Sequence, residues 1–340
     1  MKKLFAAASV LALSTTGVWA QELQIYNWGN YTNPKLIEKF EAETGIKVTI
    51  TDYDSNDTAL AKVKAGGHGF DIVVPSNSYI PIWVGEGLLL ETRPDQMPNF
   101  KNVKAEFVDV DWDPGRHYTV PWQWGSTGVV VNTKYYDGDI NTSAMFLDPP
   151  EELRGKINVV PEMGDVMSLS IMYYGGEPCT NDKEVLKKVR DGLVAAKQHW
   201  LGMDYGNLEK FAKEDLWAGV NWNGSTFRMR LQNENVNYGY PKEGFPLWMD
   251  SVAVLADAKN VEEAKTFQNF VMDPENAALI SEFARYANGI NGSEPFMPED
   301  MKSAPEIVIP AELVEKGVFT PTCDPETQKL YTRIWTDLQK

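Results

Sequence analysis

The segment Phe70–Ser76, FDIVVPS, is a short apolar run that ends in a proline and a serine. Its Ile and Val residues favour a buried strand, because β-branched side chains pack well on a pleated surface. Two earlier runs, residues 23–26 and 46–50, also have the composition of strands. Helical periodicity separates each strand from the next, and such alternation is typical of a mainly parallel sheet. The sequence therefore predicts an α/β fold.

The segments between these strands carry helix signals. Asn33 can cap a helix whose first residue is Pro34, and Gly45 can end it, since glycine adopts left-handed backbone angles without a Cβ clash. Asp57 is the expected cap of a second helix, which ends before Gly66-Gly67. These two helices complete the strand–helix alternation.

A second stretch, Phe245–Ser251 (FPLWMDS), places Trp248 and Asp250 two residues apart. In an extended segment both side chains point to the same face. An indole face beside a carboxylate suits an organic ammonium, through cation–π attraction and N–H···O bonds. The alternative is a core aromatic residue beside a solvated acid, because most Trp residues are structural. Trp28 and Ser76 follow predicted strands, where α/β sheets bind ligands.

Residues 1–20 have the pattern of a secretory signal peptide. Lys2 and Lys3 precede an apolar run over residues 4–13, and small residues mark a cleavage site after Ala20. Cleavage there would take the formal charge from -16 to -18. No later stretch approaches the ~20 apolar residues of a transmembrane helix. We therefore expect an exported protein without direct membrane insertion.

The composition is acidic, with 48 Asp and Glu residues against 32 Lys and Arg residues. Nucleic acids and anionic membranes attract proteins through Lys and Arg, so we expect neither as a partner. Positively charged small molecules would be attracted instead. About 320 residues remain after cleavage, which exceeds a typical single core and predicts two lobes.

Most motifs of cofactor and enzyme sites are absent from the sequence. The three histidines, His68, His117 and His199, are isolated, so no zinc site is predicted. Neither glycine-rich nucleotide-binding pattern occurs, and no Gly-x-Ser-x-Gly elbow is present. We expect no metal and no cofactor. A secreted glycosidase that uses two distant acids remains the enzyme alternative.

The chain has two cysteines, Cys179 and Cys323. In an oxidising compartment a structural disulfide is the expected use of such a pair. Two free, buried thiols are the alternative, because the sequence does not give the distance between them.

Six motifs follow one another along the chain: Tyr26-Asn27-Trp28-x-x-Tyr31, Glu43-Thr44-Gly45-Ile46-Lys47-Val48, Phe70-Asp71-Ile72-Val73-Val74-Pro75-Ser76, Val120-Pro121-x-x-Trp124-Gly125-x-Thr127, Trp222-Asn223-Gly224-Ser225 and Trp248-Met249-Asp250-Ser251. Together they resemble the periplasmic polyamine-binding proteins of ABC transporters, the spermidine/putrescine-binding family. The resemblance runs nearly end to end.

The resemblance implies a two-lobed periplasmic-binding-protein fold of type II, with the ligand cleft between lobes joined by a hinge. Each lobe would contain two chain segments, residues 21–127 plus 249–294 in lobe 1 and residues 128–248 plus 295–340 in lobe 2. Both cysteines would then lie in one lobe, so a disulfide would not block closure. The resemblance also implies a non-enzymatic protein that captures a polyamine and delivers it to ABC-transporter permease subunits. We expect a monomer.

The resemblance carries the family's ligand-binding residues onto positions of three chemical kinds. They are the aromatic residues Trp28, Tyr31, Trp222, Trp248 and Tyr286, the acids Glu162, Asp165 and Asp250, and the serines Ser76, Ser78 and Ser225. The aromatic residues match the walls around the alkyl chain. Asp250 matches the main carboxylate for an ammonium, and Glu162 and Asp165 match an acidic pair in the second lobe.

The choice of ligand stays open on the sequence. Ser78 resembles the putrescine-type loop, whereas Trp222-Asn223-Gly224-Ser225 resembles the spermidine type. Agmatine or a quaternary amine is an alternative ligand, but several carboxylates favour primary amines, which have N–H groups to donate. A periplasmic sensor subunit would use the same site with a different partner.

Overall fold

The computed structural model of the chain describes residues 21–340, so the predicted signal peptide lies outside the described residues. The strands are β1 (Glu22–Trp28), β2 (Lys47–Tyr53), β3 (Ile72–Val73), β4 (Thr119–Asn132), β5 (Ile157–Asn158), β6 (Trp200–Gly202), β7 (Ala218–Trp222), β8 (Val236–Gly239), β9 (Phe245–Val254) and β10 (Gly317–Phe319). The α-helices are α1 (Pro34–Thr44), α2 (Asn56–Lys64), α3 (Ile80–Gly85), α4 (Ala144–Leu147), α5 (Met163–Tyr173), α6 (Lys183–Lys197), α7 (Leu208–Ala212), α8 (Asn223–Arg230), α9 (Val261–Val271), α10 (Pro274–Ala284) and α11 (Pro325–Gln339).

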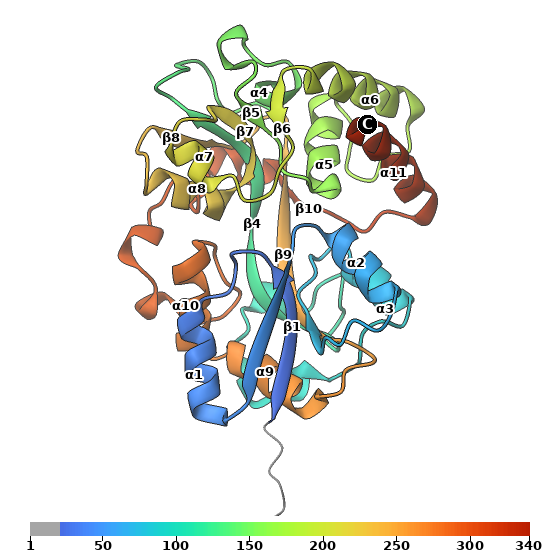
Figure 1. The fold of residues 1–340 in the computed structure, drawn as a ribbon, viewed down its shortest axis with the longest axis vertical. Helices are drawn as coiled ribbons and strands as arrows, with labels where there is room; N and C mark the ends of the chain where they lie inside the picture. The colour runs from blue at the N-terminus through green and yellow to red at the C-terminus, as the bar shows by residue number, and fades with distance from the viewer. Residues whose placement is uncertain (1–20) are drawn as a thin grey trace, which may run out of the picture.

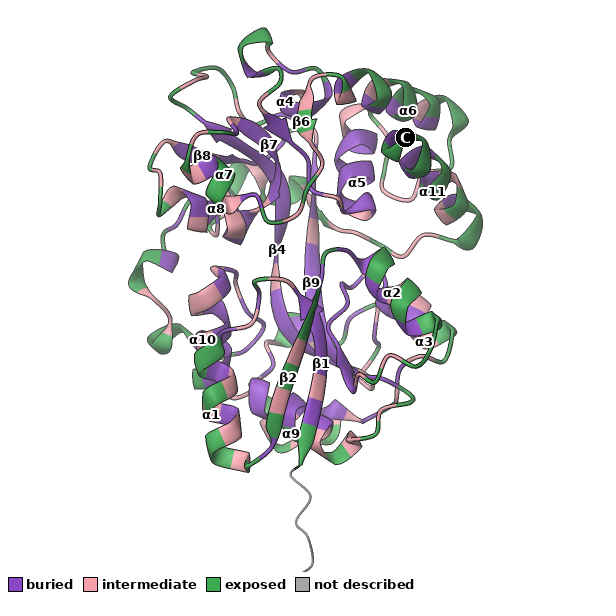
Figure 2. Cartoon of the chain, viewed as in Figure 1, coloured by how far each residue is buried: buried purple, intermediate pink, exposed green. Residues whose placement is uncertain are grey.

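Two lobes lie one above the other and are joined by the long strands β4 and β9 (Figure 1). We call the half that contains β1 the first lobe and the half that contains β5 the second lobe. One hydrophobic core has buried residues from Leu23 to Trp122 and from Trp248 to Ile290, and the other from Val129 to Phe245 and from Tyr331 to Leu338. Both connecting strands are buried over almost their whole length (Figure 2). The residue boundaries given above for the two lobes stay a prediction.

The strands form a mixed sheet in the order β2-β1-β3-β9-β4-β7-β5-β6, with β10 beside β9 and β8 beside β4. β1 pairs in parallel with β2 and β3, as the strand–helix alternation predicts. β9 is antiparallel to β3 and β4, and β4 is antiparallel to β7 and β8. The sheet is therefore less parallel than the sequence predicts. The reason is that β4 leads from the first lobe to the second and β9 leads back beside it.

The predicted N-terminal cap is confirmed for α1 and wrong for α2. α1 follows Asn33, whose side chain accepts a backbone N–H, and ends at Gly45 with a φ of 75°. The cap of α2 is Ser55 rather than Asp57, because the Ser55 side chain accepts the backbone N–H of Thr58. Asp57 instead lies in the first turn of α2, where the helix dipole favours an acid.

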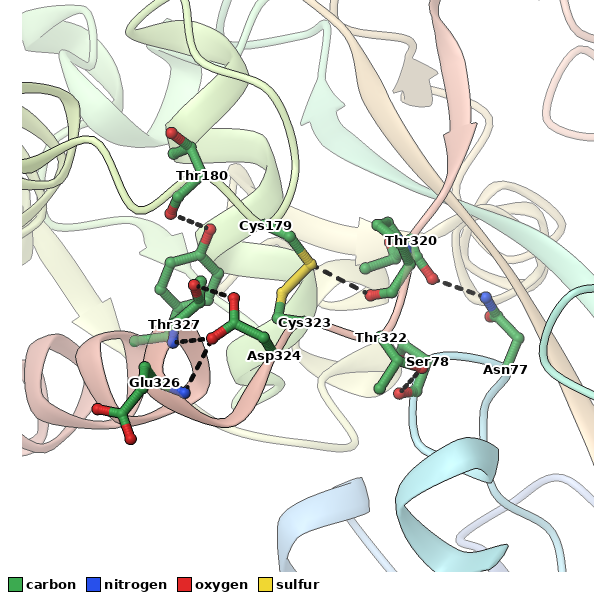
Figure 3. Close-up of a disulfide and its surroundings, with 12 residues drawn as sticks. Asn77, Ser78, Cys179, Thr180, Thr320, Thr322, Cys323, Asp324, Glu326 and Thr327 are labelled. Atoms are coloured by element: carbon green, nitrogen blue, oxygen red, sulfur yellow. Dashed lines mark hydrogen bonds between the residues drawn. A yellow bond between two sulfur atoms is a disulfide. The ribbon is translucent and has the colours of Figure 1, made fainter. Parts of the chain in front are cut away.

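Cys179 and Cys323 form a disulfide in the second lobe, as predicted (Figure 3). Their Cα atoms lie 5.1 Å apart, although 144 residues separate them in the sequence. Cys323 precedes Asp324, the cap of α11, whose side chain accepts hydrogen bonds from the N–H groups of Glu326 and Thr327. The bond therefore ties the start of α11 to the loop between α5 and α6.

Candidate ligand-binding site

A cavity that is partly open to solvent lies between the two lobes. The structure brings together most of the residues predicted from the sequence at this cavity: Trp28, Tyr31, Ser76, Ser78, Glu162, Asp165, Trp222, Trp248, Asp250 and Tyr286. Their contact with a ligand stays a prediction.

Asp250 lies on β9, two residues after Trp248, and both side chains line the cavity as expected for an extended segment. Its Oδ1 accepts a hydrogen bond of 2.6 Å from Ser76 Oγ, and its Oδ2 accepts one of 2.9 Å from the Tyr31 hydroxyl. Burial raises the pKa of Asp250 to about 7, although both hydroxyl donors lower it. The carboxylate is thus oriented, but its charge is costly in the absence of a cation.

Glu162 and Asp165 lie at the start of α5 in the second lobe. Glu162 Oε2 accepts a hydrogen bond of 3.2 Å from the N–H of Asn56, and Asp165 Oδ2 accepts one of 2.8 Å from Trp222 Nε1. Burial raises the pKa of Asp165 to about 6. Burial also raises the pKa of Glu162, and the charge of Asp165 adds to that increase. The second lobe therefore presents two neighbouring acids that oppose each other's ionisation.

Within residues 21–340, no Lys or Arg lines this cavity. Arg228 lines an adjoining cavity, where it donates to the carbonyl and side-chain oxygens of Asn30. Buried carboxylates without a basic partner destabilise a fold unless they are protonated or neutralised by a bound cation. The electrostatics of the cavity therefore favour a ligand that carries more than one positive charge.

Aromatic rings from both lobes form the remaining walls. Trp28 and Trp222, one from each lobe, meet edge to face with their ring centroids 6.2 Å apart. Trp248 packs against Tyr286 with centroids 5.1 Å apart, and Tyr205 packs against Trp222 at 5.5 Å. Such walls bury methylene groups and attract alkyl-ammonium groups to the ring faces.

The sequence matches a known protein family. Residues 35–309 match the family model of the bacterial extracellular solute-binding proteins. The chain belongs to this family.

Relatives of this solute-binding protein match almost its whole length. The chain is 30% identical to the putrescine-binding periplasmic protein SpuD of Pseudomonas aeruginosa, over 93% of the chain and 91% of the relative. It is also 30% identical to the spermidine/putrescine-binding periplasmic protein of Salmonella typhimurium, over 92% and 90%. A solved structure assigned as a spermidine/putrescine ABC transporter from Listeria monocytogenes has 30% identity and a TM-score of 0.88, with 94% of this chain and 99% of that chain covered. These matches confirm the predicted resemblance and the two-lobed fold.

Ser225 is the one predicted site residue that does not line the cavity of this solute-binding protein. Its Oγ lies 3.0 Å from the Tyr286 hydroxyl, and its N–H donates to the same hydroxyl at 3.2 Å. The structure therefore places Ser225 behind Tyr286, where it fixes the orientation of that ring.

The other lining residues, Asn56, Gly164, Tyr205 and Thr320, were not predicted from the sequence. Asn56 donates through Nδ2 to Ser76 Oγ at 3.0 Å and so supports the serine that binds Asp250. The only local feature of the sequence that could have indicated Asn56 is its position next to the helix cap Ser55. Tyr205 and Thr320 lie in irregular segments without periodicity, so tertiary structure alone brings them to the site.

Hydrogen bonds join the two lobes around the cavity. The Tyr205 hydroxyl donates to the carbonyl of Gly29 at 2.7 Å, and Asn56 donates to Glu162 as described above. On the disulfide side, Thr322 Oγ1 donates to the carbonyl of Ser78 at 2.8 Å. The lobes are therefore closed around the cavity.

Two further features are absent from the described residues. Among residues 21–340, no group of three or more His, Cys, Asp or Glu side chains is arranged to hold a metal ion. In the same part of the chain, no helix combines the length and the apolar character needed to cross a membrane.

Proposed function

We propose that this chain is the periplasmic substrate-binding protein of an ABC transporter and that it captures a polyamine of the putrescine and spermidine class. The observation that carries the proposal is the set of three buried carboxylates, Asp250, Glu162 and Asp165, in an aromatic cavity that no Lys or Arg of residues 21–340 lines. The names of the relatives, which are putrescine- and spermidine-binding periplasmic proteins, support the same ligand class.

The acids and the rings have separate roles in the proposed complex. Asp250 binds one ammonium group, and the Glu162–Asp165 pair binds another. The methylene chain lies among Trp28, Trp222 and the other rings. Because the two acidic positions belong to different lobes, a diamine touches both only when the lobes are closed, and it therefore stabilises the closed state.

The proposed protein is a monomer that releases its ligand to permease subunits and does not transform it. The proposed role is binding, because two hydroxyl donors hold the Asp250 carboxylate in one orientation at the cavity. A sensor subunit would use the same cavity with a different partner. Agmatine and quaternary amines are the alternatives to putrescine and spermidine as ligands.

A thermal-shift panel tests the ligand class. It contains putrescine, cadaverine, spermidine, spermine, agmatine and choline, with 1,4-butanediol as an uncharged match for putrescine. We expect primary amines to stabilise the protein by on the order of 3 kcal/mol at a few hundred times the dissociation constant. Butanediol should have no effect. A panel without any response to amines would overturn the proposal, and turnover of an aryl glycoside would favour the enzyme alternative.

A further inference from the structure

A second cavity adjoins the ligand cavity on the side of the disulfide. Ser78, Gly164 and Thr320 line both cavities, so the two meet at these residues. Beyond them, the second cavity is bounded by α3, by α5 and by the start of α11, with the Cys179–Cys323 disulfide in its wall. We call this space the disulfide chamber.

The polar groups of the disulfide chamber differ from those of the ligand cavity. No Asp, Glu, Lys or Arg of the described chain lines it. Its polar side chains are uncharged and include the hydroxyl groups of Ser168 and Thr320 and the carboxamide of Gln328. Thr320 Oγ1 is buried and has no hydrogen-bond partner among residues 21–340. The chamber thus offers hydrogen bonds without offering a counter-charge.

This lining favours an uncharged polar group over an ammonium. An ammonium in the chamber would lose its hydration without gaining a carboxylate, which is unfavourable. A carbonyl or amide group can instead use the hydroxyl and carboxamide groups. Gly164 lies in the first turn of α5, where backbone N–H groups have no acceptor within the helix. Those N–H groups add donors for a carbonyl oxygen at the entrance.

The entrance is held in place from both lobes (Figure 3). Asn77 Nδ2 donates to the carbonyl of Thr320 at 2.8 Å, and Thr322 Oγ1 donates to the carbonyl of Ser78. The disulfide fixes the next residue, Cys323, to the second lobe. These contacts hold the residues of the entrance in place in the closed protein.

We propose that the disulfide chamber receives the acylated arm of an N-acylated triamine, such as N1-acetylspermidine. The inference rests on the proposed function. The diamine part of such a ligand keeps its two ammonium groups at Asp250 and at the Glu162–Asp165 pair. Its acylamino-propyl arm then passes between Ser78 and Thr320. The acyl group removes the third positive charge, for which the chamber has no partner.

Calorimetric titration of the wild-type protein with putrescine, spermidine and N1-acetylspermidine tests the preference. We expect N1-acetylspermidine to bind about tenfold more tightly than spermidine, the effect of one unpaired buried polar group. Tighter binding of spermidine than of its acetylated form would overturn the inference and leave the proposed function intact. Binding of none of the three amines would overturn both.

Substitutions at Ser168, which lines the chamber but not the ligand cavity, test the location. Ser168→Leu fills the chamber and should weaken N1-acetylspermidine binding at least about tenfold, while putrescine binding changes by less than about threefold. Ser168→Ala is the matched control and should change both affinities by less than about threefold. An unchanged affinity ratio in Ser168→Leu would contradict the inference.

Gln328→Leu provides a second variant if Ser168→Leu does not fold. It removes the carboxamide at nearly constant size, and Gln328 does not line the ligand cavity. We expect a loss of about threefold to tenfold in N1-acetylspermidine affinity, with little change for putrescine. Equal losses for the two ligands would contradict a role for the chamber.

Discussion

The two acidic positions of the cavity hold their carboxylates in different ways. Asp250 stands alone on a central strand, and each of its oxygens accepts a hydroxyl group, from Ser76 and from Tyr31. Glu162 and Asp165 stand together at a helix start and raise the cost of each other's charge. The Asp250 carboxylate is held in one orientation, and no neighbouring acid of the described chain at its position can supply the charge in its place. The second can lose one charge and keep the other, so the two positions should respond unequally to substitution.

The largest effect is expected from Asp250→Asn. This change removes the single carboxylate at its position and should weaken putrescine binding by about 1.5–3 kcal/mol, the range for a charged hydrogen bond. Calorimetry at pH 8 measures the loss. Asp191→Asn, on the exposed face of α6, is the control and should bind normally. An unchanged affinity in Asp250→Asn would remove Asp250 from the proposed site.

A fall in pH from 8 to 6 should weaken putrescine binding by about tenfold, because a carboxyl with a pKa of about 7 must lose its proton to bind an ammonium. Titration in buffers of different ionisation enthalpy would also detect the released proton.

The stability of the ligand-free protein should instead increase as the pH falls. The folded-state pKa of Asp250 is raised above its ordinary value of 3.8, so protonation as the pH falls from 8 to 5 favours the folded state.

Removal of one hydroxyl donor from Asp250 should have a smaller effect. Tyr31→Phe raises the pKa of Asp250 further, because the Tyr31 hydrogen bond lowers it. We expect a loss of about 1 kcal/mol in putrescine affinity at pH 7, part of which recovers at pH 9. Tyr135→Phe, which removes a tyrosine–Glu214 hydrogen bond far from the cavity, is the matched control. A loss that does not depend on pH would show that Tyr31 acts only through packing.

The smallest effect is expected from Glu162→Gln. Asp165 remains and loses an acidic neighbour, so the loss in putrescine affinity should be about 0.5–1 kcal/mol. The double variant Glu162→Gln/Asp165→Asn should lose more than the sum of the two single variants, as expected for groups that compensate for each other. Strict additivity would contradict the comparison between the two positions.

The sequence predicted those parts of the site that depend on local periodicity. Trp248 and Asp250 face the same cavity because a strand repeats every two residues, and Trp28 and Ser76 lie at the cavity because they follow strands. Tyr205 and Thr320 could not be predicted, because long-range folding rather than a local pattern places them. The same applies to the antiparallel pairs of β4 and β9, which depend on how the chain returns between lobes.

The resemblance to a family supplied what periodicity could not. It named Glu162, Asp165 and Tyr286, which lie in segments with no local sign of a binding site. It also named Ser225, which the structure places behind Tyr286. A motif match fixes a position in the chain, but it does not fix the direction of a side chain at the start of a helix.

The two connecting strands have a consequence for how the protein unfolds. β4 supplies Trp122 to the first core and Val129 to the second, and β9 supplies Val252 to the first and Phe245 to the second. Loss of either lobe would therefore strip strands from the core of the other. We expect the lobes to melt as one cooperative unit, with equal calorimetric and van't Hoff enthalpies.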